Sequence, residues 1–126
     1  RIFIGVNSGT INLSTQSNVL SFFSNDTLPK YDRGIFIVWG KLESSMGELV
    51  HVDNTEADLK EVKYFIRGGT KEIGKWWAEN IDIAALYKRS WPKESHENAK
   101  IVIIGVASSG SSKSHSGLIK NLALSH

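Results

Sequence analysis

The chain has 126 residues, the length of one ordinary domain, and we expect residues 1–126 to fold as a single unit. Its 15 Lys+Arg against 13 Asp+Glu give a net charge of +2, which does not support nucleic-acid binding. The absence of Cys excludes disulfides, thiolate metal sites and a thiol nucleophile. No apolar run reaches the roughly 18 residues that span a bilayer, so we expect no membrane span.

Short apolar stretches between turn-forming residues predict β-strands in the first half of the chain. They lie at residues 2–6, 11–13, 19–23, 35–39, 49–52 and 62–67. The stretch 35–39 is apolar on both parities, which predicts a strand buried on both faces, with Trp39 in the core. In the stretch 62–67, Ile66 and Arg67 fall on opposite parities, so we expect them on opposite faces of the strand.

Residues 75–91 change to a helical period. Trp76, Ile83, Tyr87 and Trp91 are separated by seven, four and four positions. This spacing predicts a helix from 83 to 89, capped by Asp82 and followed by packing of Trp91.

The C-terminal part returns to a strand pattern. Residues 101–107 predict a strand, 108–117 a polar loop, and 118–124 a last strand. Six to eight short strands and one helical excursion around residues 75–91, with no βαβ rhythm, favour an antiparallel β-sandwich of jelly-roll type.

The spacing across residues 76–91 also resembles a family signature. Trp76 and Glu79 stand in a Trp-x-x-Glu pattern, followed by Asp82-Ile83, Tyr87 and Trp91. This is similar to the bacterial domain of unknown function 3047, whose members carry Trp-x-x-Glu-x-x-Asn-Val, an Asp-Tyr pair and Phe-Gly. The resemblance covers about residues 67–124. It implies an exported, galactose-binding-like jelly roll without an assigned biochemical role.

The chain departs from that family at two points. Leu86 stands where the Asp-Tyr pair has Asp, and residues 111–115 replace an acidic loop with Ser, Lys and His. Hard cations need oxygen ligands, usually carboxylates, so we carry over no metal site and expect no cofactor.

Three other motifs indicate ordinary surface structure and no ligand site. The stretch 105–114 places Lys113 two residues too late for a phosphate-binding loop. The four His residues are unclustered, which indicates surface imidazoles. The acidic stretch 53–61 lacks the spacing and the Gly of a calcium loop, which indicates a solvated turn. We therefore predict no catalytic and no metal-binding residues.

The tryptophans are the most suggestive residues. Trp76 and Trp77 are adjacent, so on a helix one would point inward and the other would be partly exposed. Exposed indoles can anchor a protein interface or stack on sugar rings. The candidate binding residues are Trp76, Trp77, Trp91, Tyr87, Arg67, Glu79 and Asp82.

We therefore expect a non-catalytic module that docks as an accessory subunit on a protein partner in a larger envelope or extracellular assembly. The alternative is a carbohydrate-binding module with an aromatic platform that takes a glycan. An enzyme would require a deep pocket with two titratable groups within hydrogen-bond reach. A chain that begins at Arg1 fits either a processed protein of the periplasm or extracellular space, or an incomplete chain.

Overall fold

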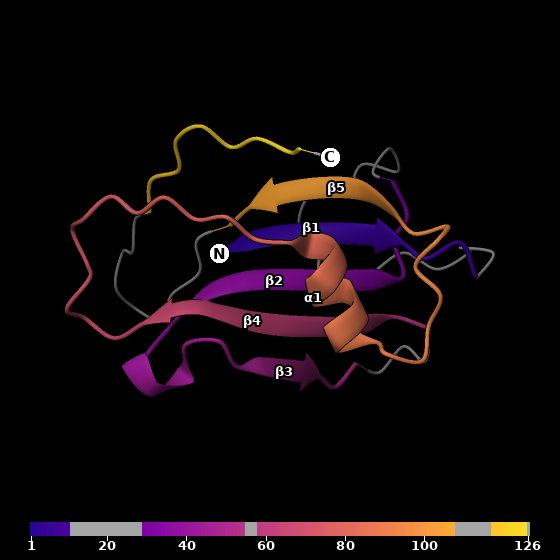
Figure 1. Cartoon of the computed structure of the whole chain (residues 1–126), viewed down its shortest axis with the longest axis horizontal. Helices are drawn as coiled ribbons and strands as arrows, with labels where there is room; N and C mark the ends of the chain where they lie inside the picture. The colour runs from indigo at the N-terminus through magenta and orange to yellow at the C-terminus, as the bar shows by residue number, and fades with distance from the viewer. Residues whose placement is uncertain (11–28, 55–57, 108–116, 126) are drawn as a thin grey trace.

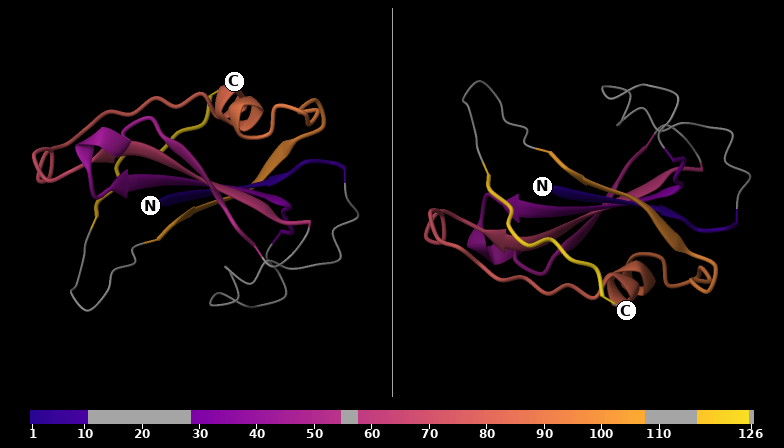
Figure 2. Two further views of the ribbon diagram at one scale, coloured as in Figure 1. Left: turned by 90° about the horizontal axis from the view of Figure 1, so that it is seen from below. Right: turned by 90° about the horizontal axis from the view of Figure 1, so that it is seen from above.

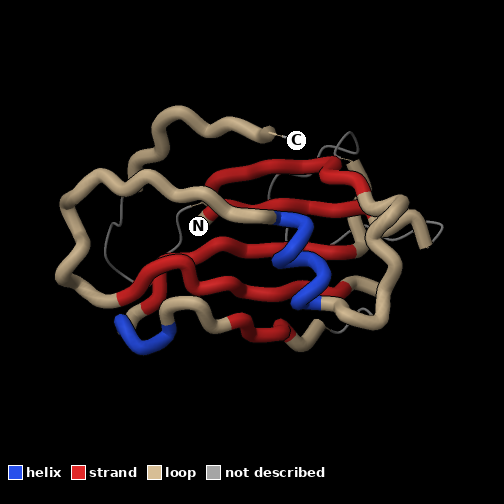
Figure 3. Tube along the Cα trace, in the orientation of Figure 1, coloured by secondary structure: helices blue, strands red, loops and turns tan. Residues whose placement is uncertain are grey.

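A single β-sheet organises the chain in its computed structural model, which describes residues 1–10, 29–54, 58–107 and 117–125. The sheet has five strands in the order β3-β4-β2-β1-β5, and one helix, α1, crosses it (Figures 1 and 3). A β-rich fold with one helical excursion is thereby confirmed. The strands are β1 (Ile2–Asn7), β2 (Arg33–Gly40), β3 (Leu49–Val52), β4 (Lys60–Gly68) and β5 (Lys100–Val106).

The sheet is mixed, whereas the sequence predicts antiparallel pairing throughout. β2 and β4 are parallel, and the other three pairs are antiparallel. The connection 41–59 contains the 3-10 turn η2 (Glu43–Ser45) and β3, and because β3 reverses the chain, β4 runs in the direction of β2. All strands in the described residues belong to this one sheet, so the predicted two-layered sandwich is not confirmed.

The helix α1 (Ile83–Ser90) matches the sequence prediction almost residue for residue. Asp82 caps it: its Oδ1 accepts the backbone N–H of Ala85 at 2.8 Å, which satisfies one of the free donors of the first turn. At the other end the N–H of Trp91 donates to the carbonyl of Tyr87 at 2.9 Å, and Pro92 follows.

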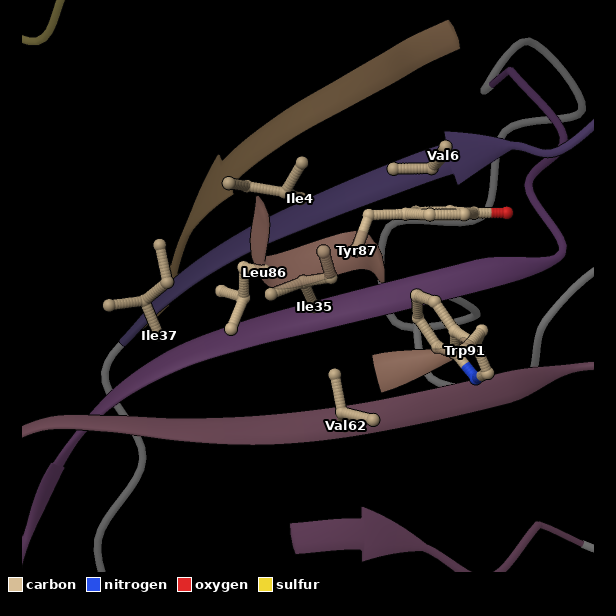
Figure 4. Packing of buried hydrophobic residues seen from close by; sticks show 8 residues of the cluster. All are labelled: Ile4, Val6, Ile35, Ile37, Val62, Leu86, Tyr87 and Trp91. Atoms are coloured by element: carbon tan, nitrogen blue, oxygen red, sulfur yellow. The ribbon is translucent and has the colours of Figure 1, made fainter. Parts of the chain in front are cut away.

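The main core lies between α1 and one face of the sheet (Figure 4). Leu86, Tyr87 and Trp91 at the helix pack on apolar side chains that alternate along three strands. The rings of Tyr87 and Trp91 meet edge to face with their centroids 4.9 Å apart. The sheet residues of this helix-face core are Ile4, Val6, Ile35, Ile37 and Val62.

A second cluster occupies the opposite face. Phe3 and Phe36, which alternate with the helix-face residues, are buried together with Tyr31 and Leu59. The ring centroid of Phe3 lies 5.1 Å from that of Tyr31 and 4.9 Å from that of Phe36. The prediction that the strand 35–39 is buried on both faces is therefore confirmed for its first half, Ile35 to Ile37.

Two sequence predictions about apolar segments are wrong. Residues 118–124 form no strand and are exposed, because the segment has no strand partner among the described residues. Trp39 is 43% exposed instead of buried, because β2 continues beyond the part of the sheet that α1 covers. The strands expected at 11–13 and 19–23, and most of the loop at 108–117, lie outside the described residues.

Replacing the helix cap tests how much α1 depends on it. Asp82→Ala should lower the free energy of unfolding by about 1 kcal/mol, because the Ala85 N–H loses its acceptor. Asp82→Asn keeps an acceptor at the same position and should change stability by less than half as much. Urea titration followed by tryptophan fluorescence measures both, and equal losses in the two variants would contradict the capping role.

Candidate functional site

Four large apolar side chains are exposed at the end of β2 and on the segment that follows β4. We call this group the tryptophan corner, and its exposed fractions are 43% for Trp39, 65% for Ile73, 66% for Trp76 and 39% for Trp77. Trp39 comes from β2, and the other three come from the segment 69–82 that joins β4 to α1. Exposed apolar groups that gather in one place are typical of a surface that contacts another molecule.

A β-bulge in β4 places Arg67 beside this corner. The pairing of β2 with β4 shifts between Val38 and Trp39. Trp39 therefore lies opposite Arg67, and Ile66 has no opposite residue on β2. Ile66 packs against the helix-face core. Arg67, the next residue, reaches the segment 69–82, which Figure 2 shows on the same side of the sheet as α1. The prediction that Ile66 and Arg67 occupy opposite faces is therefore wrong, because the bulge interrupts the alternation.

Arg67 connects the sheet to the tryptophan corner. Its guanidinium carbon lies 3.8 Å from the centroid of the Trp77 ring, and its Nε forms an ion pair with Glu79. A cation over an indole face is attracted by the π electrons, and the carboxylate fixes the orientation of the guanidinium. One face of Trp77 is consequently covered by a group of the chain itself.

Two indole N–H groups of the corner are already satisfied. Trp39 donates to the carbonyl of Gly69 at 2.9 Å, and Trp77 donates to the carbonyl of Glu72 at 3.2 Å. These bonds fix both rings against the backbone of the segment 69–82. The rings of Trp39 and Trp77 therefore present mainly carbon surface to solvent, because their N–H groups are bound inside the chain.

The backbone beside the corner is closely packed. A Cβ at Gly68 would overlap the carbonyl oxygen of Leu42, and Gly69 has a positive φ of 77°, which favours glycine. Lys71 and Glu43 form an ion pair at 3.0 Å across the same turn, and the Glu43 carboxylate raises the pKa of Lys71 by hydrogen bonding and by its charge. The segment 69–82 is thus attached where it leaves the sheet.

The structure divides the seven candidate binding residues into three groups. Arg67, Trp77 and Glu79 lie together, with Trp76 next to them and exposed. Trp76 and Trp77 precede α1, so neither lies on a helix and neither points into the core. The remaining three have structural positions: Tyr87 and Trp91 are buried in the helix-face core, and Asp82 caps α1.

A buried ion-pair cluster at the other end of β2 was not predicted from the sequence. The Arg33 Nε donates to Glu94 at 2.7 Å, and its Nη1 lies 3.3 Å from a carboxylate oxygen of Asp32. Asp32 also accepts the backbone N–H of Ser8 at 2.8 Å and its hydroxyl. The Nζ of Lys60 contacts Glu94 at 2.6 Å. Asp32 and Arg33 are 2% and 4% exposed, so the buried charges are paired.

The cluster shifts the pKa of one of its members, Glu94, and of the neighbouring Tyr87. Burial disfavours ionisation of the Glu94 carboxyl, but hydrogen bonds and charges from Arg33 and Lys60 outweigh it and lower its pKa. Burial, together with the charge of Glu94, raises the pKa of Tyr87. The Tyr87 hydroxyl and the Trp91 Nε1 are buried without a hydrogen-bond partner among the described residues.

The acidic stretch 53–61 is partly buried, whereas the described histidines are exposed. Glu61 is 2% exposed and accepts from Asn54 at 3.2 Å, so the stretch 53–61 is not solvated throughout as predicted. His51 and His96 are exposed, as predicted. The described residues contain no group of three or more His, Asp or Glu that could hold a metal ion.

Comparisons with known proteins returned no match to a family model, to a curated protein or to a solved structure. Among the described residues, no helix has the length and apolar character needed to cross a bilayer.

The ion-pair cluster predicts a pH-dependent stability. Because the pKa of Glu94 is lower in the folded than in the unfolded chain, the unfolded chain takes up the proton first as the pH falls. The contribution of Glu94 should therefore be complete above its ordinary pKa of 4.5 and should be lost as the pH falls through the folded value. Urea unfolding of the wild type and Glu94→Gln should differ at neutral pH and converge in acid.

Glu97→Gln is the matched control, since Glu97 is exposed and lies three residues further along the chain. Its difference from the wild type should stay small at every pH. A wild-type advantage over Glu94→Gln that is the same at neutral and acid pH would contradict the assignment.

Proposed function

We propose that this chain is a non-catalytic interaction module that docks on a protein partner through the tryptophan corner. One observation carries the proposal: Trp39 at the end of β2, and Ile73, Trp76 and Trp77 on the segment 69–82 that is bonded to it, all expose large apolar surfaces. Interfaces are enriched in aromatic residues that fill pockets of the partner, and tryptophan is frequent among the residues that dominate binding energy.

The polar environment of the corner favours a protein partner over a glycan. Sugar recognition combines an open aromatic face with polar groups that bind hydroxyls. Here Arg67 covers one face of Trp77 and pairs with Glu79, and the N–H groups of Trp39 and Trp77 bind backbone carbonyls. The glycan-binding alternative depends on Trp76, whose indole is 66% exposed.

The family resemblance supports a proposal about the setting of the module. We infer that the chain is related to the domain of unknown function 3047 and works in the periplasm or outside the cell, as part of a larger assembly. The order of Trp76, Glu79, the helix α1, the Pro92 linker and the strand β5 supports this relationship. The jelly-roll sandwich of that family also belongs to the proposal, with the five-stranded sheet as its first layer.

Binding measurements with single truncations test the docking surface. Trp76→Ala and Trp77→Ala should each weaken partner binding by about 2 kcal/mol, roughly thirtyfold in Kd, because a central aromatic anchor is lost. The partner is first captured from envelope extracts of the producing cells by the immobilised full chain, and Kd values are then measured by calorimetry. Val50→Ala is the matched control, since Val50 is 46% exposed on β3, away from the corner.

The same variants separate the two binding functions. A titration of the full chain with an oligosaccharide panel, followed by tryptophan fluorescence, should show no saturable change. A saturable change that Trp76→Ala abolishes would replace the protein partner with a glycan. Equal partner binding by wild type, Trp76→Ala and Trp77→Ala would refute docking through the corner.

A further inference from the structure

The strand β5 ends the sheet, and its apolar side chains are incompletely covered. β5 (Lys100–Val106) is apolar from Ile101 to its end, yet none of its residues is fully buried. Ile101 is 39% and Val106 is 56% exposed. No described strand lies beyond it in the sheet order. An apolar edge strand with free backbone groups is a template for pairing with another chain segment.

The hydrogen bonds to β1 show which backbone groups of β5 face this free edge. Arg1 and Ala107 exchange both backbone bonds, at 2.9 and 3.0 Å, so they form a hydrogen-bonded antiparallel pair. Such pairs alternate with pairs that exchange no bonds. In the observed register, Val106 lies opposite Ile2 and Ile104 lies opposite Ile4, so the N–H and C=O groups of Val106 and Ile104 point away from β1.

The C-terminal segment has the properties of a strand without a partner. It exposes four large apolar side chains and has no regular structure between residues 117 and 125. Figure 1 shows it running back along the β5 side of the sheet, and Figure 2 shows that it is displaced from β5 itself. The exposed fractions are 80% for Leu118, 45% for Ile119, 54% for Leu122 and 61% for Leu124.

We propose that two copies of this chain form a dimer in which residues 118–124 of each copy add a strand to the β5 edge of the other. β5 has seven residues, and the segment 118–124 has the same length. In the strand pattern, Leu118, Leu122 and Leu124 share one face, so pairing would cover them against the exposed side chains of β5.

The second copy is the occupant because edge and segment are complementary and both belong to this chain. In the single chain both are left without a partner in the described residues, although only eleven residues, 107–117, separate them along the sequence. A reciprocal exchange satisfies both at once and closes with twofold symmetry, which is the commonest symmetry of soluble oligomers. The other sheet edge, β3, has only four residues, which gives a partner strand fewer bonds.

Sedimentation and hydrogen exchange of the full chain test the dimer. The mass should rise from one chain to two as the concentration increases. In the same range, the amides of Ile104 and Val106 should become at least tenfold more protected, because in the monomer they point away from β1. Gly105 donates toward β1 in this register and should be protected at every concentration.

Substitutions identify the segment and the edge. The double variant Leu122→Asp/Leu124→Asp should weaken dimerisation at least tenfold, because carboxylates would have to be buried. Leu42→Asp/Met46→Asp is the matched control and should dimerise normally. Both residues have similar exposure and lie in the connection between β2 and β3, away from the β5 edge. Val106→Pro removes an outward N–H without breaking a bond to β1, and should weaken the dimer while leaving the unfolding midpoint of the monomer nearly unchanged.

Three results would overturn the proposal. The first is a single-chain mass at every accessible concentration. The second is protection of Ile104 and Val106 that does not depend on concentration, which would place the segment on the edge of its own chain. The third is a dimer that survives Leu122→Asp/Leu124→Asp. None of these results bears on docking through the tryptophan corner, which lies on β2 and the segment after β4 and not on the β5 edge.

Discussion

The packing of α1 on the sheet is the constraint on which the remaining structure depends. Leu86, Tyr87 and Trp91 lie against Ile35 and Val62, the two sheet residues with no measurable exposure. Burial of such side chains contributes about 1.5–3 kcal/mol each, so this contact fixes the position of the helix. Residues 69–82 must then run from the end of β4 to the start of α1, which places Trp76 and Trp77 outside the core.

The two ends of the central strands consequently have opposite character. At the start of β2, Asp32 and Arg33 are buried charges that neutralise each other and bind the backbone and Glu94. At the end of β2, Trp39 is an apolar side chain left in solvent. The buried charges are paired inside the chain and stabilise the fold. The exposed indoles are not part of the core, so they are available to contact another molecule. This contrast places the candidate site at the tryptophan end.

Local signals in the sequence predicted the elements whose structure is decided locally. The cap at Asp82, the stop at Pro92 and the period of the helix place α1 to within one residue. Alternation and β-branched residues located the five strands. The parallel pairing of β2 with β4 could not be predicted in this way, because strand direction depends on how the connection 41–59 crosses the sheet.

The candidate site was predicted in part for the same reason. The residue types Arg67, Trp77 and Glu79 were identified, but their meeting depends on the bulge in β4, which the alternating pattern conceals. The ion-pair cluster was missed because Arg33 and Glu94 are far apart in sequence and become partners only in the folded chain. A charged pair directly before an apolar strand, as in Asp32-Arg33, was the available signal.

The bulge at Ile66 has a consequence for how this surface can vary. Side chains before Ile66 alternate regularly between the two faces of the sheet. Because of the extra residue, Ile66 and Arg67 lie on the same face, and the alternation is offset by one residue from Arg67 onward. Exchange of one side chain for another in β4 leaves this offset intact. Loss of Ile66 would place Arg67 directly after Phe65 in a regular alternation, opposite Trp39 and still on the helix side, while the core would lose the Ile66 side chain. The bulge therefore lets β4 give two consecutive side chains to the helix side, Ile66 to the core and Arg67 to the tryptophan corner.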